Sequence, residues 1–486
     1  MKNNMKMNIT YTNYFFLIFI LFFFYSQEYY IQEGHDPSKI ITNFTFGSNY
    51  YGRYSKEEDI FKTINEHNSN LWIWLGNAVY LDKPKLNYFS KSPETMDWDF
   101  IKLLYEKAKN NKYYKELREK TPIIGTWGDE EYGVLNGDKE NNLKESYKQY
   151  YLDFLDADTL DQRRNYVDMG IYSTYSFGTG TRTVRFILLD LKYNQTSYLK
   201  EENNYDMLGE DQWIWLENIF KNTKETYTFI CISNQILPND RFIIKKWYSD
   251  SRKRLFDLIG KYKRNGVIFL SGGLGFAQIL KTFCPLPKVG YNLYECTSSG
   301  LSHSNKISSF INNVYHNDYL IENTNYNGIN FGEVVINWDD KNNNVNNSYV
   351  ELNIYDQNDT IVSDVIINYK DLIYTNDTKD YYLKEKNMKE IQYMNIYDGE
   401  SCEREIYHRV RTPFMNLKYY LTHLSQLPIA IISAVFIIIF CELLFKRRLL
   451  LFLIILLVLI ISFAVYLLSY YIDLMNYNEF KRKMLA

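Results

Sequence analysis

Three consecutive carboxylates, Asp129, Glu130 and Glu131, are the residues of this sequence whose chemistry is easiest to name. They follow a short apolar run at 121–124 and lie between Gly125 and Gly133. A β-branched run that ends in a glycine-bounded acidic cluster predicts a strand leading into a loop. Ligands of α/β proteins bind beyond the carboxyl ends of strands, so these oxygens are placed to hold a hard cation or a metal-bound phosphate. A solvated acidic turn is the alternative interpretation.

The segments around this cluster alternate between strand and helix patterns, which predicts an α/β domain. Strands are expected at 40–47, 71–75, 171–178, 183–190, 228–232 and 266–270. Helices are expected at 59–70, 98–120, 143–154, 209–220 and 252–263. Three further strands, at 330–338, 349–355 and 361–367, are expected to close the domain as a second sheet.

Composition excludes some function classes. The chain has 486 residues and a formal net charge of −3, and no basic stripe interleaves with aromatic residues, so we expect no nucleic-acid partner. Its five cysteines form neither a disulfide scaffold nor a CxxC zinc pair. In a lumenal domain, Cys284 and Cys296, which flank a turn, are a candidate disulfide pair.

Both ends of the chain carry membrane or secretion signals. Residues 1–26 contain a short apolar run after two lysines, which predicts a signal peptide or an uncleaved signal anchor. Residues 369–420 are polar and are expected to form a stalk, and 427–445 and 449–471 are long and apolar enough to be two transmembrane helices. Lys446-Arg447-Arg448 joins them, and the positive-inside rule places this link in the cytoplasm.

These signals predict a membrane protein of the secretory pathway or the cell surface, with its large domain lumenal or extracellular. Beyond residues 1–26, five Asn-x-Ser/Thr sequons agree with that location and are candidate glycosylation sites. They are Asn43, Asn194, Asn346, Asn358 and Asn376.

Seven segments, ordered along the chain between residues 43 and 338, resemble the motifs of the PhoD-like alkaline phosphatases, which belong to the calcineurin-like metallophosphatase superfamily. They are FGSN (46–49), WLGNAVY (74–80), TWGDEEYG (126–133), LLDLKY (188–193), LGEDQWIWL (208–216), LSGGLGF (270–276) and ECTSSGLSH (295–303). The resemblance implies a metallophosphatase-like αββα sandwich at 40–368, to which the transmembrane helical hairpin is appended.

The resemblance also implies a two-metal centre that activates hydroxide and clamps phosphate, but most ligand positions have changed. The family has Cys, Asp, Asp, His, Asp and His where this chain has Asn49, Asn77, Gly128, Glu130, Gly273 and Gly275. The arginine of the family's LLDxRY is Lys192, which keeps the charge but loses bidentate phosphate contact. Asp129, Asp190 and His303 remain, and Glu131 stands in for an aspartate.

We interpret this pattern as a pseudophosphatase that has kept the fold and lost the site. It is expected to act in binding or assembly, with protein partners and a membrane, and without a metal cofactor. The alternative is an active phosphomonoesterase or phosphodiesterase with a rebuilt site around Asp129, Glu130, Glu131 and His303, which would need Ca, Fe, Mg or Zn. In a third hypothesis the hairpin carries the function and the ectodomain regulates it.

Two single features have alternatives of their own. His303 is either a leftover ligand or acid/base group, or a hydrogen-bonded structural histidine. The Gly272-Gly273 pair is compatible with a phosphate-binding nest, but no P-loop lysine follows it, and loss of a ligand explains the second glycine better.

Overall fold

The computed structural model describes residues 33–51, 59–81, 98–134, 137–197, 205–238, 247–282, 289–304, 319–339 and 344–375. All of them lie in one compact unit, Met1–Cys402. The expected signal segment, both expected transmembrane helices, Cys284, Asn376 and nearly all of the expected stalk fall outside these ranges. Among the helices within them, none is both long and apolar enough to cross a bilayer.

In this part of the chain the first sheet has the strand order β1-β5-β6-β7-β8-β10-β9. β6, β7, β8 and β10 are parallel, while β5 pairs antiparallel with β6, which confirms the predicted pairing of those two strands. The strands are Glu33–Asp36 (β1), Ser173–Thr179 (β5), Arg182–Leu188 (β6), Tyr227–Ile232 (β7), Val267–Ser271 (β8), Gln278–Lys281 (β9) and Tyr294–Thr297 (β10).

The second sheet has the order β13-β12-β11-β2-β3-β4. Its strands are Asn43–Gly47 (β2), Trp72–Leu75 (β3), Ile123–Thr126 (β4), Asn330–Asn337 (β11), Tyr349–Asp356 (β12) and Ile361–Asn368 (β13). The three C-terminal strands do lie in a second sheet, as expected, but they do not form it alone. β11 pairs with β2, so the first strands of the domain belong to the same sheet.

The two sheets pack face to face through apolar side chains. Phe44 of β2 lies in edge-to-face contact with Phe186 of β6 and Phe229 of β7, with 4.9 Å between ring centroids in each pair. All three rings are fully buried. Such aromatic pairs stabilise a core beyond the area that they bury, and they fix the two sheets against each other.

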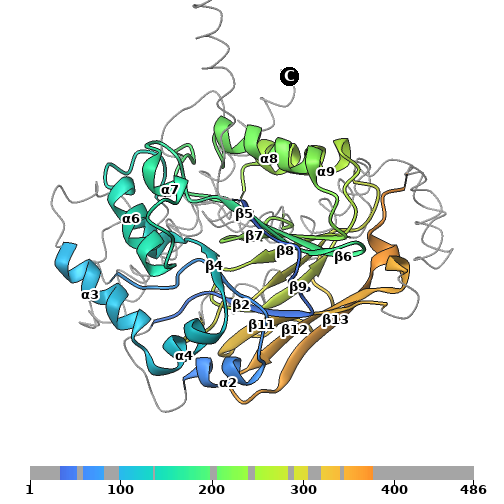
Figure 1. Ribbon diagram of the computed structural model, residues 1–486, viewed down its shortest axis with the longest axis horizontal. Coiled ribbons are helices and arrows are strands. Elements are labelled where there is room, and N and C mark those ends of the chain that lie inside the picture. Colours follow the sequence, from blue (N-terminus) through green and yellow to red (C-terminus); the bar gives the residue numbers. More distant parts are fainter. Residues whose placement is uncertain are drawn as a thin grey trace, which may run out of the picture. The chain divides into compact units, whose positions relative to one another are not determined.

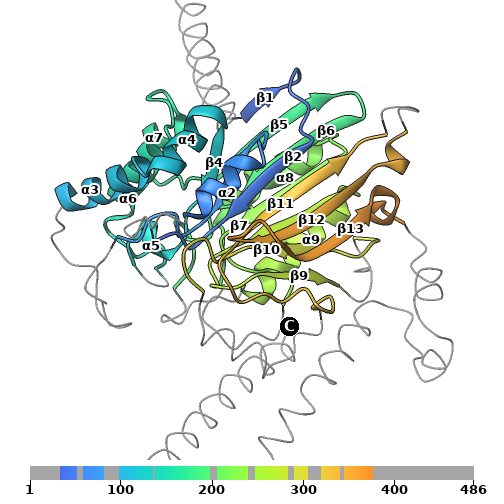
Figure 2. The same cartoon turned by 90° about the horizontal axis from the view of Figure 1, so that it is seen from below.

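Helices cover the outer faces of this sandwich. Figure 1 shows α8 (Glu210–Asn222) and α9 (Ser249–Lys261) on one side and α2 (Ile60–Glu66) and α4 (Lys112–Lys120) on the other. The remaining α-helices are α3 (Trp98–Lys109), α5 (Asp129–Tyr132), α6 (Lys144–Phe154) and α7 (Gln162–Asn165), and Figure 2 shows α3, α6 and α7 grouped at one end of the sheets. Two 3₁₀ turns, Val345–Asn347 and Tyr369–Leu372, flank β12 and β13.

Two sequence predictions were wrong in detail. The single helix expected at 98–120 is two helices, because Asn111 caps α4 by accepting from the N–H groups of Tyr113 and Tyr114, both at 3.1 Å. The loop expected after β4 begins with α5, a single helical turn that ends at Gly133 in the left-handed conformation, with φ of 88°.

Candidate functional site

The loops that follow the parallel strands of both sheets meet at one edge of the sandwich. Thr126 at the end of β4 donates its Oγ1 hydrogen to the carbonyl of Leu189, which follows β6, at 2.8 Å. Ser48 after β2 donates to the carbonyl of Ser298 after β10 at 3.1 Å. Strand ends are the place where α/β folds bind ligands, and the residues predicted for the site lie in these loops.

Glu131 is buried at this edge and accepts hydrogen bonds from four backbone N–H groups. Asn77 donates at 3.0 Å, Val79 at 3.1 Å and Gly128 at 2.9 Å, and Ala78 is the fourth donor. Burial raises the pKa of the Glu131 carboxyl, and the backbone donors oppose that rise. The carboxylate therefore fastens the loop after β3 to the loop after β4.

Asp129 forms a buried ion pair. Its Oδ1 lies 2.6 Å from Nζ of Lys192, and the two side chains are 3% and 4% exposed. An ion pair without solvent needs good geometry and a close partner to offset the loss of hydration. The aspartate that the sequence singled out as a candidate ligand thus already has a cationic partner.

The amides of Asn49 and Asn77 occupy two of the altered positions. Asn77 donates its Nδ2 hydrogen to Oδ1 of Asn49 at 2.7 Å, and its own Oδ1 accepts from the backbone N–H of Glu130 at 3.4 Å. Asn49 and Asn77 both adopt positive φ, at 62° and 54°, which asparagine tolerates better than most residues. These side chains thus form a neutral link between the loops after β2, β3 and β4.

Asp190 accepts hydrogen bonds from an indole and from three backbone N–H groups of the protein. Its carboxylate accepts from the indole N–H of Trp127 at 2.8 Å and from the backbone N–H groups of Ile171, Lys192 and Tyr193 at 2.9, 2.8 and 3.0 Å. Burial raises its pKa, while these donors act in the opposite direction. Asp190 thereby holds Trp127 and the chain that carries Lys192.

His303 lies in a half-buried group with two tyrosines. Its Nε2 is 3.0 Å from the hydroxyl of Tyr80 and its Nδ1 is 3.1 Å from Oγ of Ser302. Its ring makes an edge contact with Tyr51 at 6.5 Å. Burial lowers the pKa of His303, which favours the neutral imidazole. Its ring nitrogens contact hydroxyl groups, as expected of a structural histidine, although a neutral imidazole is also competent as a base.

Three consecutive N–H groups that follow Gly272 after β8 already donate to serine hydroxyls. The N–H of Gly273 donates to Oγ of Ser48 at 3.0 Å, and the N–H groups of Leu274 and Gly275 both donate to Oγ of Ser299 at 2.8 Å. Serine hydroxyls therefore fill the place that a nest would offer to an anion. Sequence reasoning did not assign this role to Ser48 and Ser299, although both lie in the family-like motifs.

The positions that would have to supply metal ligands do not fit a two-metal centre. Within the ranges that the structure describes, no group of three or more His, Cys, Asp and Glu side chains could hold a metal ion. A Cβ added at Gly128 would lie 2.2 Å from Oδ1 of Asn77, and one added at Gly273 would lie 2.3 Å from the carbonyl oxygen of Ser233. Gly273 also has φ of 74°, a conformation that most other residues rarely adopt. The space for the two side chains is closed.

The remaining candidate residues lie elsewhere or are only partly described. Cys296 is a buried free thiol in this structure, which disagrees with the predicted disulfide between Cys284 and Cys296; Cys284 itself falls outside the described residues. Asn346 and Asn358 are exposed, whereas Asn43 and Asn194 are half-buried. The glycosylation of all five sequons stays a prediction.

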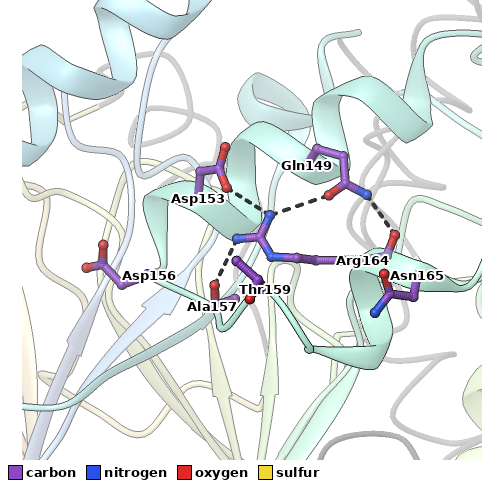
Figure 3. A pocket seen from close by; sticks show the side chains of 7 residues that line it. All are labelled: Gln149, Asp153, Asp156, Ala157, Thr159, Arg164 and Asn165. Atoms are coloured by element: carbon purple, nitrogen blue, oxygen red, sulfur yellow. Dashed lines mark hydrogen bonds and ion pairs between the residues drawn. The ribbon is translucent and has the colours of Figure 1, made fainter.

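A separate surface groove, of about 570 Å³, lies along α6 and α7 and contains none of these candidates. Figure 3 shows Arg164 across it, where the guanidinium contacts Asp153 at 2.8 Å and the carbonyl of Ala157 at 2.9 Å. Gln149 donates to the carbonyl of Arg164 at 3.0 Å. The polar groups of this groove therefore bond to one another, and its chemistry suggests no ligand.

Comparison with solved structures supports the fold. A structure of PhoD matches this chain with a TM-score of 0.51 and 13% identity, and the match covers 71% of this chain and 76% of the other. At that identity the likeness shows the fold alone. The metallophosphatase-like sandwich predicted from the seven motifs is confirmed at that level.

Two further structures match less closely. One, described as a candidate 5′-nucleotidase of Staphylococcus aureus in complex with α-ketoglutarate, has a TM-score of 0.30 and 13% identity, covering 70% of this chain and 57% of the other. The other, from Thermus thermophilus, has a TM-score of 0.29 and 9% identity, covering 68% and 99%. Both TM-scores are too low to bear on the fold of this chain. No protein-family model and no curated protein sequence matches the chain.

Proposed function

From its PhoD-like metallophosphatase fold, we propose that this chain is a non-catalytic, membrane-anchored ectodomain that acts by binding or assembly with protein partners. One observation carries the proposal: the acidic groups kept at the strand ends serve the protein's own loops. Asp129 pairs with Lys192, and Glu131 accepts from four backbone N–H groups. A phosphatase of this fold needs such carboxylates on metal ions, where they bring charge to a hydroxide-activating centre.

The test of this proposal is metal content together with turnover. The full chain, purified in detergent, is expected to contain no stoichiometric Ca, Fe, Mg or Zn by elemental analysis. It is also expected to hydrolyse p-nitrophenyl phosphate and bis(p-nitrophenyl) phosphate no faster than buffer alone does. Stoichiometric metal accompanied by turnover that Asp129→Ala abolishes would establish the hydrolase alternative instead.

The hydrolase alternative has one observation in its favour. The hydroxyl of Tyr80 contacts Nε2 of His303, and the charges of Glu130, Glu131 and Asp129 add to burial in raising the pKa of Tyr80. A neutral histidine beside acids is a set that could move a proton. If a rebuilt site uses it, His303→Gln will lower turnover at least tenfold at saturating metal while the thermal midpoint stays unchanged. With no wild-type turnover to lower, this alternative fails.

The proposed anchor is tested by fractionation. Full-length protein is expected to resist alkaline carbonate extraction, and a variant that lacks residues 421–486 is expected to be secreted. Mass spectrometry of the mature N-terminus then distinguishes a cleaved signal peptide from a signal anchor. If the truncated protein still pellets with membranes, the two C-terminal segments are not the anchor. If the secreted form also restores the phenotype of cells that lack the full chain, the hairpin is an anchor and not the functional element.

A further inference from the structure

The buried pair of Lys192 and Asp129 joins two loops of the strand-end edge. Asp129 is the first residue of α5, directly after β4, and Lys192 lies four residues beyond the end of β6. Nζ of Lys192 is 2.6 Å from Oδ1 of Asp129, and neither side chain is more than 4% exposed. At this separation in a poorly hydrated site, removing either partner takes away the opposite charge that offsets the cost of burying the other.

The backbone around Lys192 is itself fixed. The N–H of Lys192 donates to Oδ1 of Asp190 at 2.8 Å, and the same oxygen accepts from the indole of Trp127 at 2.8 Å. Trp127 lies two residues before Asp129 in the chain. Two contacts therefore join the two loops: the hydrogen bond from Trp127 to Asp190 and the ion pair of Lys192 with Asp129. Lys192 is thus held in a fixed position inside the protein.

The polar groups around the ion pair are also bonded to groups of the protein itself. Glu131 is covered by its four N–H donors, and the amide of Asn77 bonds to Asn49. In place of side chains that could bind a second cation stand Gly128 and Gly273, where even a Cβ would collide. A divalent ion would have to displace the ammonium of Lys192 from Asp129.

We propose that the ammonium of Lys192 is the built-in cation of this site: it neutralises Asp129 and locks α5 in place, as a bound metal would in an enzyme of this fold. The inference rests on the proposed loss of catalysis and names the charge that Asp129 keeps. The resembled motif has an arginine where this chain has Lys192, so the cation at this position is retained and not newly acquired. Substituting ligands back at single positions will not restore metal binding, because the space and the charge are both taken.

A double-mutant cycle tests the pair in the full chain. We expect Lys192→Met and Asp129→Asn each to lower the thermal midpoint by about 5 °C or more, and the double variant to lower it by clearly less than the sum. The exposed pair Arg254 and Glu210, whose closest approach is 2.8 Å, is the matched control. Its cycle is expected to show coupling within experimental error. Additive effects at Lys192 and Asp129 would overturn the proposal.

A metal arm separates this inference from the proposed function. Wild-type protein is expected to keep its thermal midpoint within 1–2 °C (roughly the scale of a weak nonspecific effect) in Mn²⁺, in Zn²⁺ or in EDTA. A midpoint that rises with Mn²⁺ and falls with EDTA would overturn it. Turnover of an aryl phosphate without coupling to added metal would sink the proposed function while leaving the ion pair intact.

If Lys192→Met does not fold, a spectroscopic readout keeps the test open. In protein labelled with ¹⁵N-lysine, a buried ammonium paired with a carboxylate is expected to give a signal that is protected from exchange with water. That signal should be lost in Asp129→Asn and kept in Glu210→Gln. Its absence from the folded wild-type protein would contradict the proposal.

Discussion

At the scale of single residues, Glu131 is the acid on which the strand-end loops depend. Replacing it with alanine leaves the N–H groups of Asn77, Ala78, Val79 and Gly128 without their acceptor inside a site where water is scarce. A buried unsatisfied donor costs about 1–3 kcal/mol. We expect Glu131→Ala to lower the free energy of unfolding by about 3 kcal/mol or more, measured by urea denaturation.

Glu130 is the matched control because it is the neighbouring acid and is only half-buried. Glu130→Ala is expected to change the free energy of unfolding by about 1 kcal/mol or less, as surface substitutions do. Equal effects at the two positions would show that the backbone donors are satisfied in some other way. Glu131 would then be free to act as a ligand.

The sequence shows which metal-binding side chains the site lacks, but it does not show which residues pair with the side chains that remain. Glycine at 128 and 273 supplies no ligand in any fold, so loss of the metal side chains followed from residue identity alone. The pairing of Asp129 with Lys192, and the capping of Gly273 by Ser48, join loops far apart in the chain. Such contacts depend on how two sheets stack, and no local pattern encodes that arrangement.

At the scale of elements, the longer segments were predicted well because their apolar periodicity is local. The four-residue strands β1, β9 and β10 were not predicted, because their sequences EGHD, QILK and YECT are broken by polar residues. The equally short β3 is a continuous apolar run, WIWL, and was predicted. The break between α3 and α4 was also missed, because the apolar positions continue through it and only the capping side chain of Asn111 marks it. The pairing of β11 with β2 needs contacts between the two ends of the domain.

One element contact predicts a pH dependence of stability. His67, which caps the C-terminus of α2, lies 3.0 Å from Oε1 of Glu333 in β11 and 2.8 Å from Oδ1 of Asp359 in the β12–β13 turn. Its ring packs edge-on against Phe331 and Tyr355, at 5.0 and 4.6 Å. Burial alone would lower the pKa of His67, but the hydrogen bonds and charges of Glu333 and Asp359 outweigh it, and the pKa is raised.

The sign follows from linkage. A raised pKa in the folded state stabilises the protein fully below the unfolded value of 6.5, and the gain disappears as pH rises through the folded pKa. We expect the contribution of His67 to the free energy of unfolding to fall as pH rises above 6.5 and through the folded pKa. His67→Gln should flatten that part of the profile. A slope that persists in His67→Gln would mean that other groups cause it.

At the scale of the whole molecule, the fold makes some sequons accessible to glycosylation and places the side-chain amides of others in internal hydrogen bonds. Nδ2 of Asn43 in β2 donates to the carbonyl of His67 at 3.2 Å and to Oε1 of Glu333 at 3.4 Å. A glycan on that nitrogen would replace one of its hydrogens and would have to pass through the contact between α2 and β11. The sequence pattern alone treats all five sites as equal.

Asn346 and Asn358 are different, because both are exposed, in the 3₁₀ turn before β12 and in the β12–β13 turn. If the domain faces the lumen, we expect glycans at these two asparagines and none at Asn43. Peptide mapping before and after glycosidase treatment of protein from a eukaryotic secretory host measures occupancy at each site. Asn346→Gln and Asn358→Gln should each increase gel mobility by one step. Occupied Asn43 would mean that the chain is modified before α2 packs against β11, and an unmodified protein that has reached the cell surface would show that exposure alone does not select these sites.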